Sequence, residues 1–193
     1  MTSLIYRHPR LYRGVLALLY GGALRAREAF VARHVPPGAR VVDVACGDGG
    51  IRRVLPGRAY VGVDVSPVFV DALRAAGVEA HRLDVARDDL PTGDVVLMLC
   101  ALYQFLPDVD PVVERLRRAA RRHVLLAEPH RNLAQSRHAL VRAIARRATD
   151  PGVVSSTGRF DEASLRALFT RHGATEIVAT RKELIAVLPG LAS

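Results

Sequence analysis

The sequence predicts an α/β domain with a doubly wound, mostly parallel sheet of seven strands, an antiparallel edge strand and N-terminal lid helices. Short apolar runs alternate with stretches of helical periodicity, which is typical of parallel strands joined by crossover helices. The first run opens onto a glycine-rich turn, and the next one ends in an acidic residue. Such a pair of strand ends favours a nucleoside-type ligand at the carboxyl edge of the sheet.

Seven apolar runs have the length of strands. They cover residues 40–45, 59–64, 78–83, 94–99, 123–128, 174–179 and 183–188. The last two are separated by only a few residues around Arg181, which is too short for a crossover helix. We therefore expect these two runs to form an antiparallel hairpin at one edge of the sheet.

Three helices between these strands carry their own start and stop signals. They are Pro67 to Ala76, ended by Gly77; Pro111 to Arg122; and Asp161 to His172, with Asp161 as N-cap and Gly173 as terminator. Residues 1–193 are expected to form one domain, because this length buries a continuous core. Within it we expect a helical lid at 1–37 and a core at 38–193, with a helical insertion at 130–160 from about Leu133 to Ala148.

The chain is strongly basic, with a net charge of +9 and 28 basic residues, all arginine except Lys182. The arginines are dispersed along helices without the interleaved aromatic residues that stack on single-stranded nucleic acid. Solvated helix faces explain this pattern better than a nucleic-acid surface. Nucleic acid is therefore disfavoured as a partner, although the charge keeps RNA open as an alternative.

The cysteines and the N-terminus indicate a reduced, cytoplasmic protein. Cys46 and Cys100 both stand in apolar contexts, and no cysteine or histidine pair has ligand spacing, so no metal site is expected. Basic residues before an apolar run at 15–20 mimic a signal peptide, but no clean cleavage site follows. The run is also far shorter than a membrane span, so we expect an amphipathic helix.

Residue identities in the glycine-rich turn disfavour two common classes of ligand, the dinucleotides NAD and FAD and the nucleotides ATP and GTP. The dinucleotide fingerprint needs a third glycine where this chain has Arg52. A phosphate-binding P-loop needs a lysine after its last glycine, yet the only lysine is Lys182. What remains is a ligand with a ribose and an adenine but no phosphate.

Four motifs in register then resemble the class I S-adenosylmethionine-dependent methyltransferases, a Rossmann-like, seven-stranded family. Residues 42–49 read Val-Asp-Val-Ala-Cys-Gly-Asp-Gly and resemble the first motif, with Ala45 in place of the usual first glycine. The second, third and fourth motifs resemble residues 60–66, 81–85 and 94–100. The resemblance covers about residues 38 to 130, and it implies S-adenosyl-L-methionine as cofactor and S-adenosyl-L-homocysteine as product.

The resemblance also assigns cofactor contacts. Asp64 follows Gly47 by 17 residues, near the spacing of an acid that accepts from ribose hydroxyls. Asp43 would orient the glycine loop and the methionine ammonium, whereas Asp84 and Val85 would contact adenine. The complete expected set is Asp43, Ala45, Cys46, Gly47, Gly49, Asp64, Val65, Asp84, Val85, Cys100 and Tyr20.

Candidate catalytic residues follow the fourth and fifth strands. His130 is the best candidate for a general base, since an ordinary histidine titrates near neutral pH. Glu128 would orient it or bind substrate, and Tyr103 would line the site or donate. Two of them have a plain alternative, namely a solvent-exposed loop histidine for His130 and a core aromatic for Tyr103. Gln104 stands where many small-molecule relatives carry a histidine, and glutamine takes no proton at neutral pH.

The segment after the fourth strand also bears on the acceptor. It lacks the Asn-or-Asp-Pro-Pro-aromatic motif of amino-group nucleic-acid methylases. Leu99 precedes Cys100 and no later cysteine exists, which disfavours Cys100 as a cytosine C5 nucleophile. The sequence thus predicts methyl transfer to a small-molecule or lipid-like acceptor, with RNA methylation and cofactor binding without transfer as alternatives.

Overall fold

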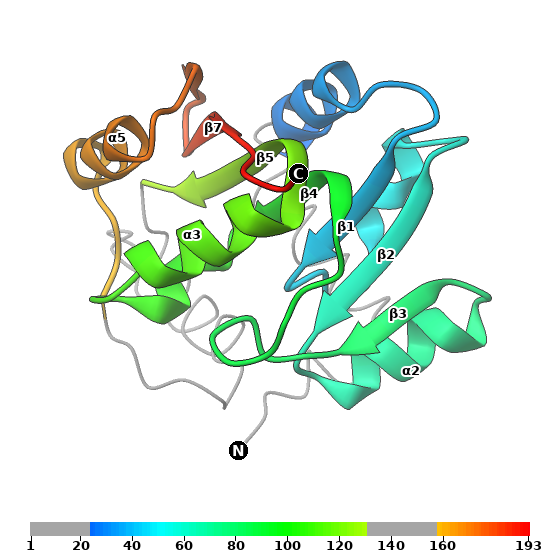
Figure 1. Cartoon of the computed structure of the whole chain (residues 1–193). Coiled ribbons are helices and arrows are strands. Elements are labelled where there is room, and N and C mark those ends of the chain that lie inside the picture. The colour runs from blue at the N-terminus through cyan, green and yellow to red at the C-terminus, as the bar shows by residue number, and fades with distance from the viewer. Residues whose placement is uncertain (1–23, 131–157) are drawn as a thin grey trace, which may run out of the picture.

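The computed structural model describes residues 24–130 and 158–193. One sheet runs through the molecule, with helices on both of its faces (Figure 1). Tyr20, the lid residues before position 24 and the helix expected near 133–148 lie outside the described residues.

The seven strands lie in the order β3-β2-β1-β4-β5-β7-β6. They are β1 (Arg40–Val44), β2 (Ala59–Asp64), β3 (Glu79–Arg82), β4 (Gly93–Leu99), β5 (Ala120–Pro129), β6 (Glu176–Ala179) and β7 (Glu183–Pro189). β7 pairs antiparallel with both β5 and β6, while the other pairs are parallel. The expected doubly wound sheet is confirmed, and so is the hairpin, which places β7 inside the sheet and β6 at its edge.

The helices match the sequence at their beginnings better than at their ends. They are α2 (Pro67–Ala75), α3 (Asp110–Ala119), α5 (Glu162–Arg171) and the short 3-10 helices η2 (Gly50–Val54) and η3 (Leu102–Phe105). Residues 24–34 are also helical. The expected helix end at Arg122 is wrong, because Ala120 already pairs with Gly93 and begins β5.

The signals at the ends of α5 and α2 behave as expected. The Asp161 side chain accepts a hydrogen bond from the backbone N–H of Ser164 at 2.8 Å, closing a capping box. Gly77 and Gly173 take positive φ values of 72° and 73° just beyond their helices. A left-handed residue at this position lets the chain turn away from the helix.

Strand alternation divides the core into two layers. Val42 and Val44 of β1 belong to the cluster that contains the apolar faces of α3 and α5. Val41 belongs to the opposite cluster, with Phe30 and Val31 of the helix over 24–34. The sheet is therefore covered on both faces, and successive residues of a strand point into different layers of the core.

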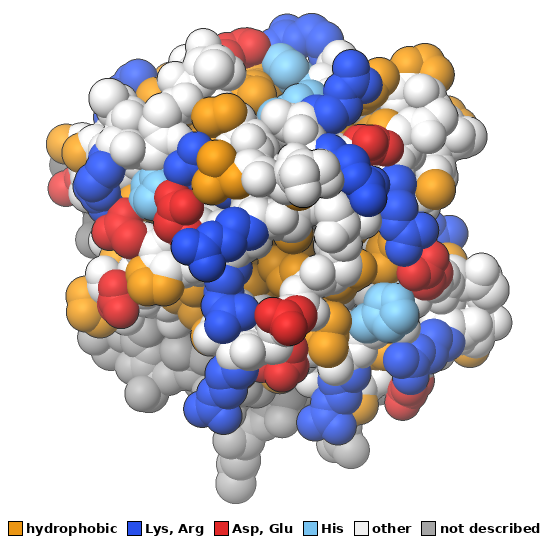
Figure 2. All heavy atoms as spheres, viewed as in Figure 1, with side chains coloured by type: hydrophobic (Ala, Val, Ile, Leu, Met, Phe, Trp, Pro, Cys, Tyr) orange, Lys and Arg blue, Asp and Glu red, His pale blue; other side chains and the backbone are white. Residues whose placement is uncertain are grey.

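The surface in Figure 2 shows arginine side chains interspersed with acidic and apolar ones. Many of the arginines are engaged with acidic partners; Arg171, for example, reaches Asp110 at 2.9 Å. In the described part of the chain, no helix is long and apolar enough to cross a membrane. The cytoplasmic location stays a prediction.

Candidate functional site

The carboxyl ends of β1 and β4 lie side by side at the point where the strand order reverses. Val44 of β1 pairs with Met98 of β4, after which the chain leaves β1 toward β2 and leaves β4 toward β5. Ala45 and Cys100 both take positive φ values there, 56° and 63°. Open α/β sheets bind their ligands at such a switch point, and left-handed residues other than glycine are frequent at functional sites.

The turn after β1 packs tightly against β2 and α2. The backbone N–H of Cys46 donates to the carbonyl of Val63 at 3.1 Å, which joins the turn to the end of β2. Gly49 has a φ of 63°, and a Cβ there would lie 2.8 Å from Cδ2 of Leu73 and 3.2 Å from the Tyr60 hydroxyl. Glycine is therefore required at this position both for its backbone conformation and for space.

Asp64 joins this turn to the following strand. Its Oδ2 accepts from the backbone N–H of Gly47 at 2.8 Å, and its Oδ1 accepts from that of Ser66 at 2.9 Å. Burial raises the pKa of the Asp64 carboxyl, against the lowering effect of these hydrogen bonds. Each carboxylate oxygen keeps a further lone pair. The carboxylate is thus fixed in place while it can still accept from a pair of hydroxyls.

Asp43 lies buried at the end of β1, where its Oδ2 accepts from the Tyr60 hydroxyl at 2.6 Å. Burial raises the pKa of Asp43 to about 7, and the Tyr60 hydrogen bond only partly offsets this. The charge of Asp64 raises the pKa further, and that of Arg27 lowers it. A cationic group at this edge would stabilise the ionised form. Sequence reasoning missed Tyr60, because its distance from Asp43 in the chain gives no sign of the contact.

Val65 and the two residues expected around adenine, Asp84 and Val85, have different surroundings. Val65 is 41% exposed directly beside Asp64, so it offers an apolar surface next to the fixed carboxylate. Asp84 instead accepts from the backbone N–H of Ala86 at 3.0 Å, within the turn after β3. Val85 is buried in the core. The adenine assignment of Asp84 and Val85 stays a prediction.

Arg27 is a site residue that sequence reasoning missed. It is buried, and its guanidinium contacts Cys100 Sγ and lies 3.2 Å from Glu183 Oε1. It stands three and four residues before Phe30 and Val31, on the same helical face as these core residues. This spacing is the signal that would have identified it, because a charged residue on a buried helix face needs a partner.

The segment after β4 is also held by Glu128. The Glu128 side chain is fully buried, and its Oε1 accepts from the backbone N–H of Leu102 at 2.5 Å. Tyr103 follows in η3, where the Arg159 guanidinium lies 4.2 Å from the centre of its ring. Both of these predicted residues therefore lie with Cys100 in one local structure.

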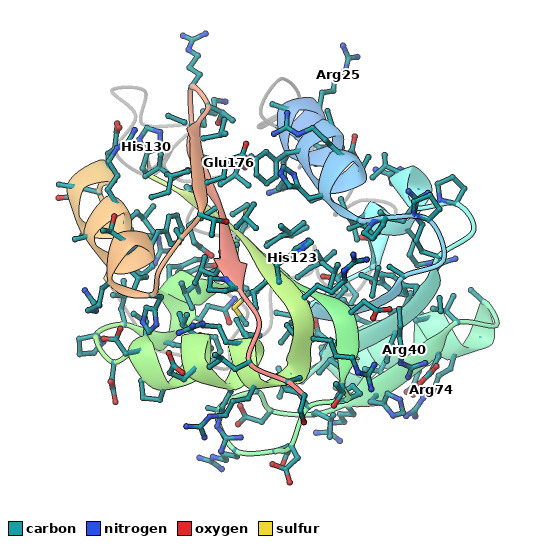
Figure 3. The ribbon with its side chains drawn as sticks, turned by 45° about the horizontal axis from the view of Figure 1, so that its top comes forward. Arg25, Arg40, Arg74, His123, His130 and Glu176 are labelled. Carbon is teal, nitrogen blue, oxygen red and sulfur yellow. The ribbon has the colours of Figure 1, made fainter. Side chains whose placement is uncertain are left out.

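His130 lies at the end of β5 but turns toward other elements. Its Nε2 lies 3.3 Å from the carbonyl oxygen of Thr180, and its Nδ1 lies 3.8 Å from Oε2 of Glu162. Figure 3 shows the ring beside α5 and the β6–β7 hairpin. The ring is largely buried there rather than in a solvent-exposed loop. Its role as a general base stays a prediction.

These residues fit a nucleoside with a cationic substituent. Asp64 presents fixed acceptors for two hydroxyls, Val65 gives an apolar face, and the buried Asp43 favours a neighbouring cation. Among the described residues, no group of histidine, cysteine and acidic side chains has the arrangement of a metal site.

Comparison with known proteins agrees with a site for such a nucleoside. Residues 42–127 match the family model of a methyltransferase domain. The chain thus contains the sequence pattern of a methyltransferase domain, over somewhat less than half of its length. This match begins within β1 and ends near the end of β5, so it includes both strand ends that form the switch point.

A curated protein that is similar to this chain is trans-aconitate 2-methyltransferase of Mycobacterium tuberculosis. It is 34% identical over 114 residues, which are 56% of this chain and 43% of that protein. The protein from Mycobacterium marinum is 32% identical over 113 residues, with the same coverage. The chain thus spans less than half the length of the curated relatives it matches.

Solved methyltransferase structures share the fold. A methyltransferase from Aquifex aeolicus superposes with a TM-score of 0.63 at 16% identity, covering 95% of this chain and 99% of that one. Human N-acetylserotonin methyltransferase, solved with S-adenosylmethionine, gives a TM-score of 0.63 at 15% identity, covering 97% of this chain and 58% of that one. At these identities, the superpositions show the common fold alone.

Proposed function

We propose that this methyltransferase domain transfers a methyl group from S-adenosylmethionine to a small-molecule acceptor. The observation that carries the proposal is the geometry of Asp64. Its two carboxylate oxygens are held by backbone N–H groups of Gly47 and Ser66, directly beside the β1–β4 switch point. A ribose in this place would meet acceptors that are already oriented, so little ordering would be needed on binding.

The chain's own residues would act mainly by positioning. Asp64 would accept from the ribose hydroxyls, and Asp43 would stabilise the ammonium of the methionine portion. The bound cofactor supplies a methyl group on a cationic sulfur. Holding donor and acceptor in line accounts for much of the rate enhancement available to such a reaction. Few side chains then need to exchange protons.

The acceptor that fits best is a small molecule with a carboxylate. The relatives described above are trans-aconitate methyltransferases, and this chain carries a net charge of +9. Beside η3, the exposed Arg159 stacks on Tyr103 and places a cation near the end of β4. A guanidinium binds a carboxylate with two parallel hydrogen bonds. These features favour an anionic acceptor over an uncharged lipid.

Replacement of Asp64 tests the donor site. Asp64→Ala is expected to weaken S-adenosylmethionine binding by at least about tenfold in isothermal titration calorimetry, because hydrogen bonds to a charged group are lost. Asp71→Ala is the matched control, since Asp71 lies on α2 with its side chain 74% exposed. Equal affinities of Asp64→Ala and the unmodified protein would remove the ribose assignment, and no binding by the unmodified protein would refute the proposed function.

A further inference from the structure

The short segment from Cys100 to Leu102 is fastened from both faces of the sheet. Glu183 of β7 and Arg27 contact Cys100 on the face covered by the helix over 24–34. Glu128 of β5 contacts Leu102 on the other face, which α3 and α5 cover. Glu128 lies two residues after Leu126, so both side chains point to this face. Buried side chains from three elements therefore converge on one turn of the backbone.

This segment lies opposite the glycine-rich turn that begins the donor site. The pairing of Val44 with Met98 brings the residues that follow β1 next to those that follow β4. Cys100 has a φ of 63°, and its N–H donates to the Ala127 carbonyl at 2.6 Å. A backbone in this conformation needs support from its surroundings. A shift of the segment would move the backbone that lies beside the turn after β1.

Glu128 supplies that support at a cost in stability. Its Oε1 accepts from Leu102 N–H at 2.5 Å, while Oε2 has no hydrogen-bond partner among the described residues. A buried carboxyl with an unsatisfied oxygen costs free energy that an apolar side chain would avoid. Stability alone therefore does not explain Glu128, whereas the placement of the Leu102 N–H does.

We infer that Glu128 is a positioning residue for donor binding, which fixes the segment 100–105 against β5 beside the turn after β1. The inference rests on the proposed function, because it assigns this segment to the wall of the donor site. Glu128 acts through the backbone of Leu102 and needs no contact with the donor itself.

The protonation state of Glu128 determines which substitution should preserve its contact with Leu102. Burial raises the pKa of Glu128 to about 8, and the neighbouring Glu183 contributes to this. Cys100 and Tyr103 are the other titratable groups near it, and Arg27 contacts Cys100 from the opposite face of the sheet. The neutral carboxyl prevails at pH 7, and its carbonyl oxygen still accepts from Leu102. Glutamine has the same shape and the same acceptor, so Glu128→Gln should preserve the contact.

The test compares S-adenosylmethionine affinity in Glu128→Ala, Glu128→Asp and Glu128→Gln at pH 7 by calorimetry. We expect the dissociation constant to rise about tenfold or more for Ala and Asp, which withdraw the acceptor from Leu102, and to stay within about threefold for Gln. Hydrogen exchange of the amides in 100–105 should accelerate in Ala and Asp but not in Gln. Glu79→Gln, at the start of β3, is the control for losing an exposed carboxylate.

The outcomes separate this inference from the proposed function. If the unmodified protein does not bind S-adenosylmethionine, both fail. If it binds, but Ala and Asp bind equally well, or Gln binds as poorly as Ala, the positioning role of Glu128 alone is overturned. Glu128→Asp keeps the test decisive if Glu128→Ala does not fold, because it removes only one methylene group.

Discussion

At the scale of single residues, the proposed donor site contains carboxyls whose environments differ. Asp64 has a backbone N–H on each oxygen, whereas Asp43 is buried with one hydroxyl partner and has its pKa raised to about 7. Both aspartates were expected from the sequence, Asp64 from its place at the end of the second strand and Asp43 from the resemblance of residues 42–49 to the first motif. The sequence did not predict Tyr60 or Arg27, since these contacts depend on how elements pack rather than on local spacing.

Asp43 makes the stability of the protein depend on pH. Its folded pKa of about 7 lies above its ordinary value of 3.8, so the folded state keeps a proton that the unfolded state has lost. The free energy of unfolding should therefore fall as pH rises from about 4 to about 7, at up to about 1.4 kcal/mol per pH unit.

Urea unfolding of Asp43→Asn between pH 4 and pH 8 tests this dependence. Asparagine still accepts from the Tyr60 hydroxyl but does not titrate, so the fall in unfolding free energy should be shallower than in the unmodified protein. A residual slope up to about pH 8 is expected from Glu128, whose pKa is raised to about 8. Identical slopes for the two proteins would contradict the buried state of Asp43.

At the scale of elements, the strands were predictable and their connections less so. Apolar runs located all seven strands. The signal is clearest for β1, β2 and β4, because parallel strands that are buried on both faces are continuously hydrophobic. The end of α3 was misplaced, since Arg121 and Arg122 continue a helical pattern although β5 has already begun. The 3-10 helices η2 and η3 escaped prediction because five and four residues are too few to show a periodicity.

The turn after β1 should tolerate no side chain at Gly49. Gly49→Ala adds a Cβ at a φ of 63°, 2.8 Å from the buried Leu73. Gly57→Ala is the matched control, because Gly57 has a φ of 72° but no atom within 4 Å of the added Cβ. We expect the control to lose about 1 kcal/mol from backbone strain and Gly49→Ala to lose a further 1 to 3 kcal/mol, roughly, from overpacking. Equal losses in chemical denaturation would show that the turn has room.

At the scale of the whole molecule, the charge distribution bears on the proposed class of acceptor. The net charge is +9, but the face in Figure 2 mixes arginine with acidic side chains. Among its described residues, the face shown lacks the continuous basic groove with which proteins track a nucleic-acid backbone. The sequence indicated this dispersal, whereas the acceptor itself cannot be derived from motifs that contact only the donor.

A transfer assay with methyl-labelled S-adenosylmethionine compares these acceptors. Label should pass to trans-aconitate or to another small carboxylate in a cell extract, and Arg159→Ala should lower that transfer while leaving donor affinity unchanged. RNA should take up no label, and any RNA binding should weaken steeply with salt. Labelled RNA without labelled carboxylates would overturn the proposed acceptor class.

The most direct measurement is a crystal structure of the protein with S-adenosylhomocysteine. We predict that the product lies across the carboxyl ends of β1 and β4, with its ribose hydroxyls on the carboxylate of Asp64 and its adenine against Val65. A product molecule bound elsewhere, or a ribose that does not contact Asp64, would contradict the account.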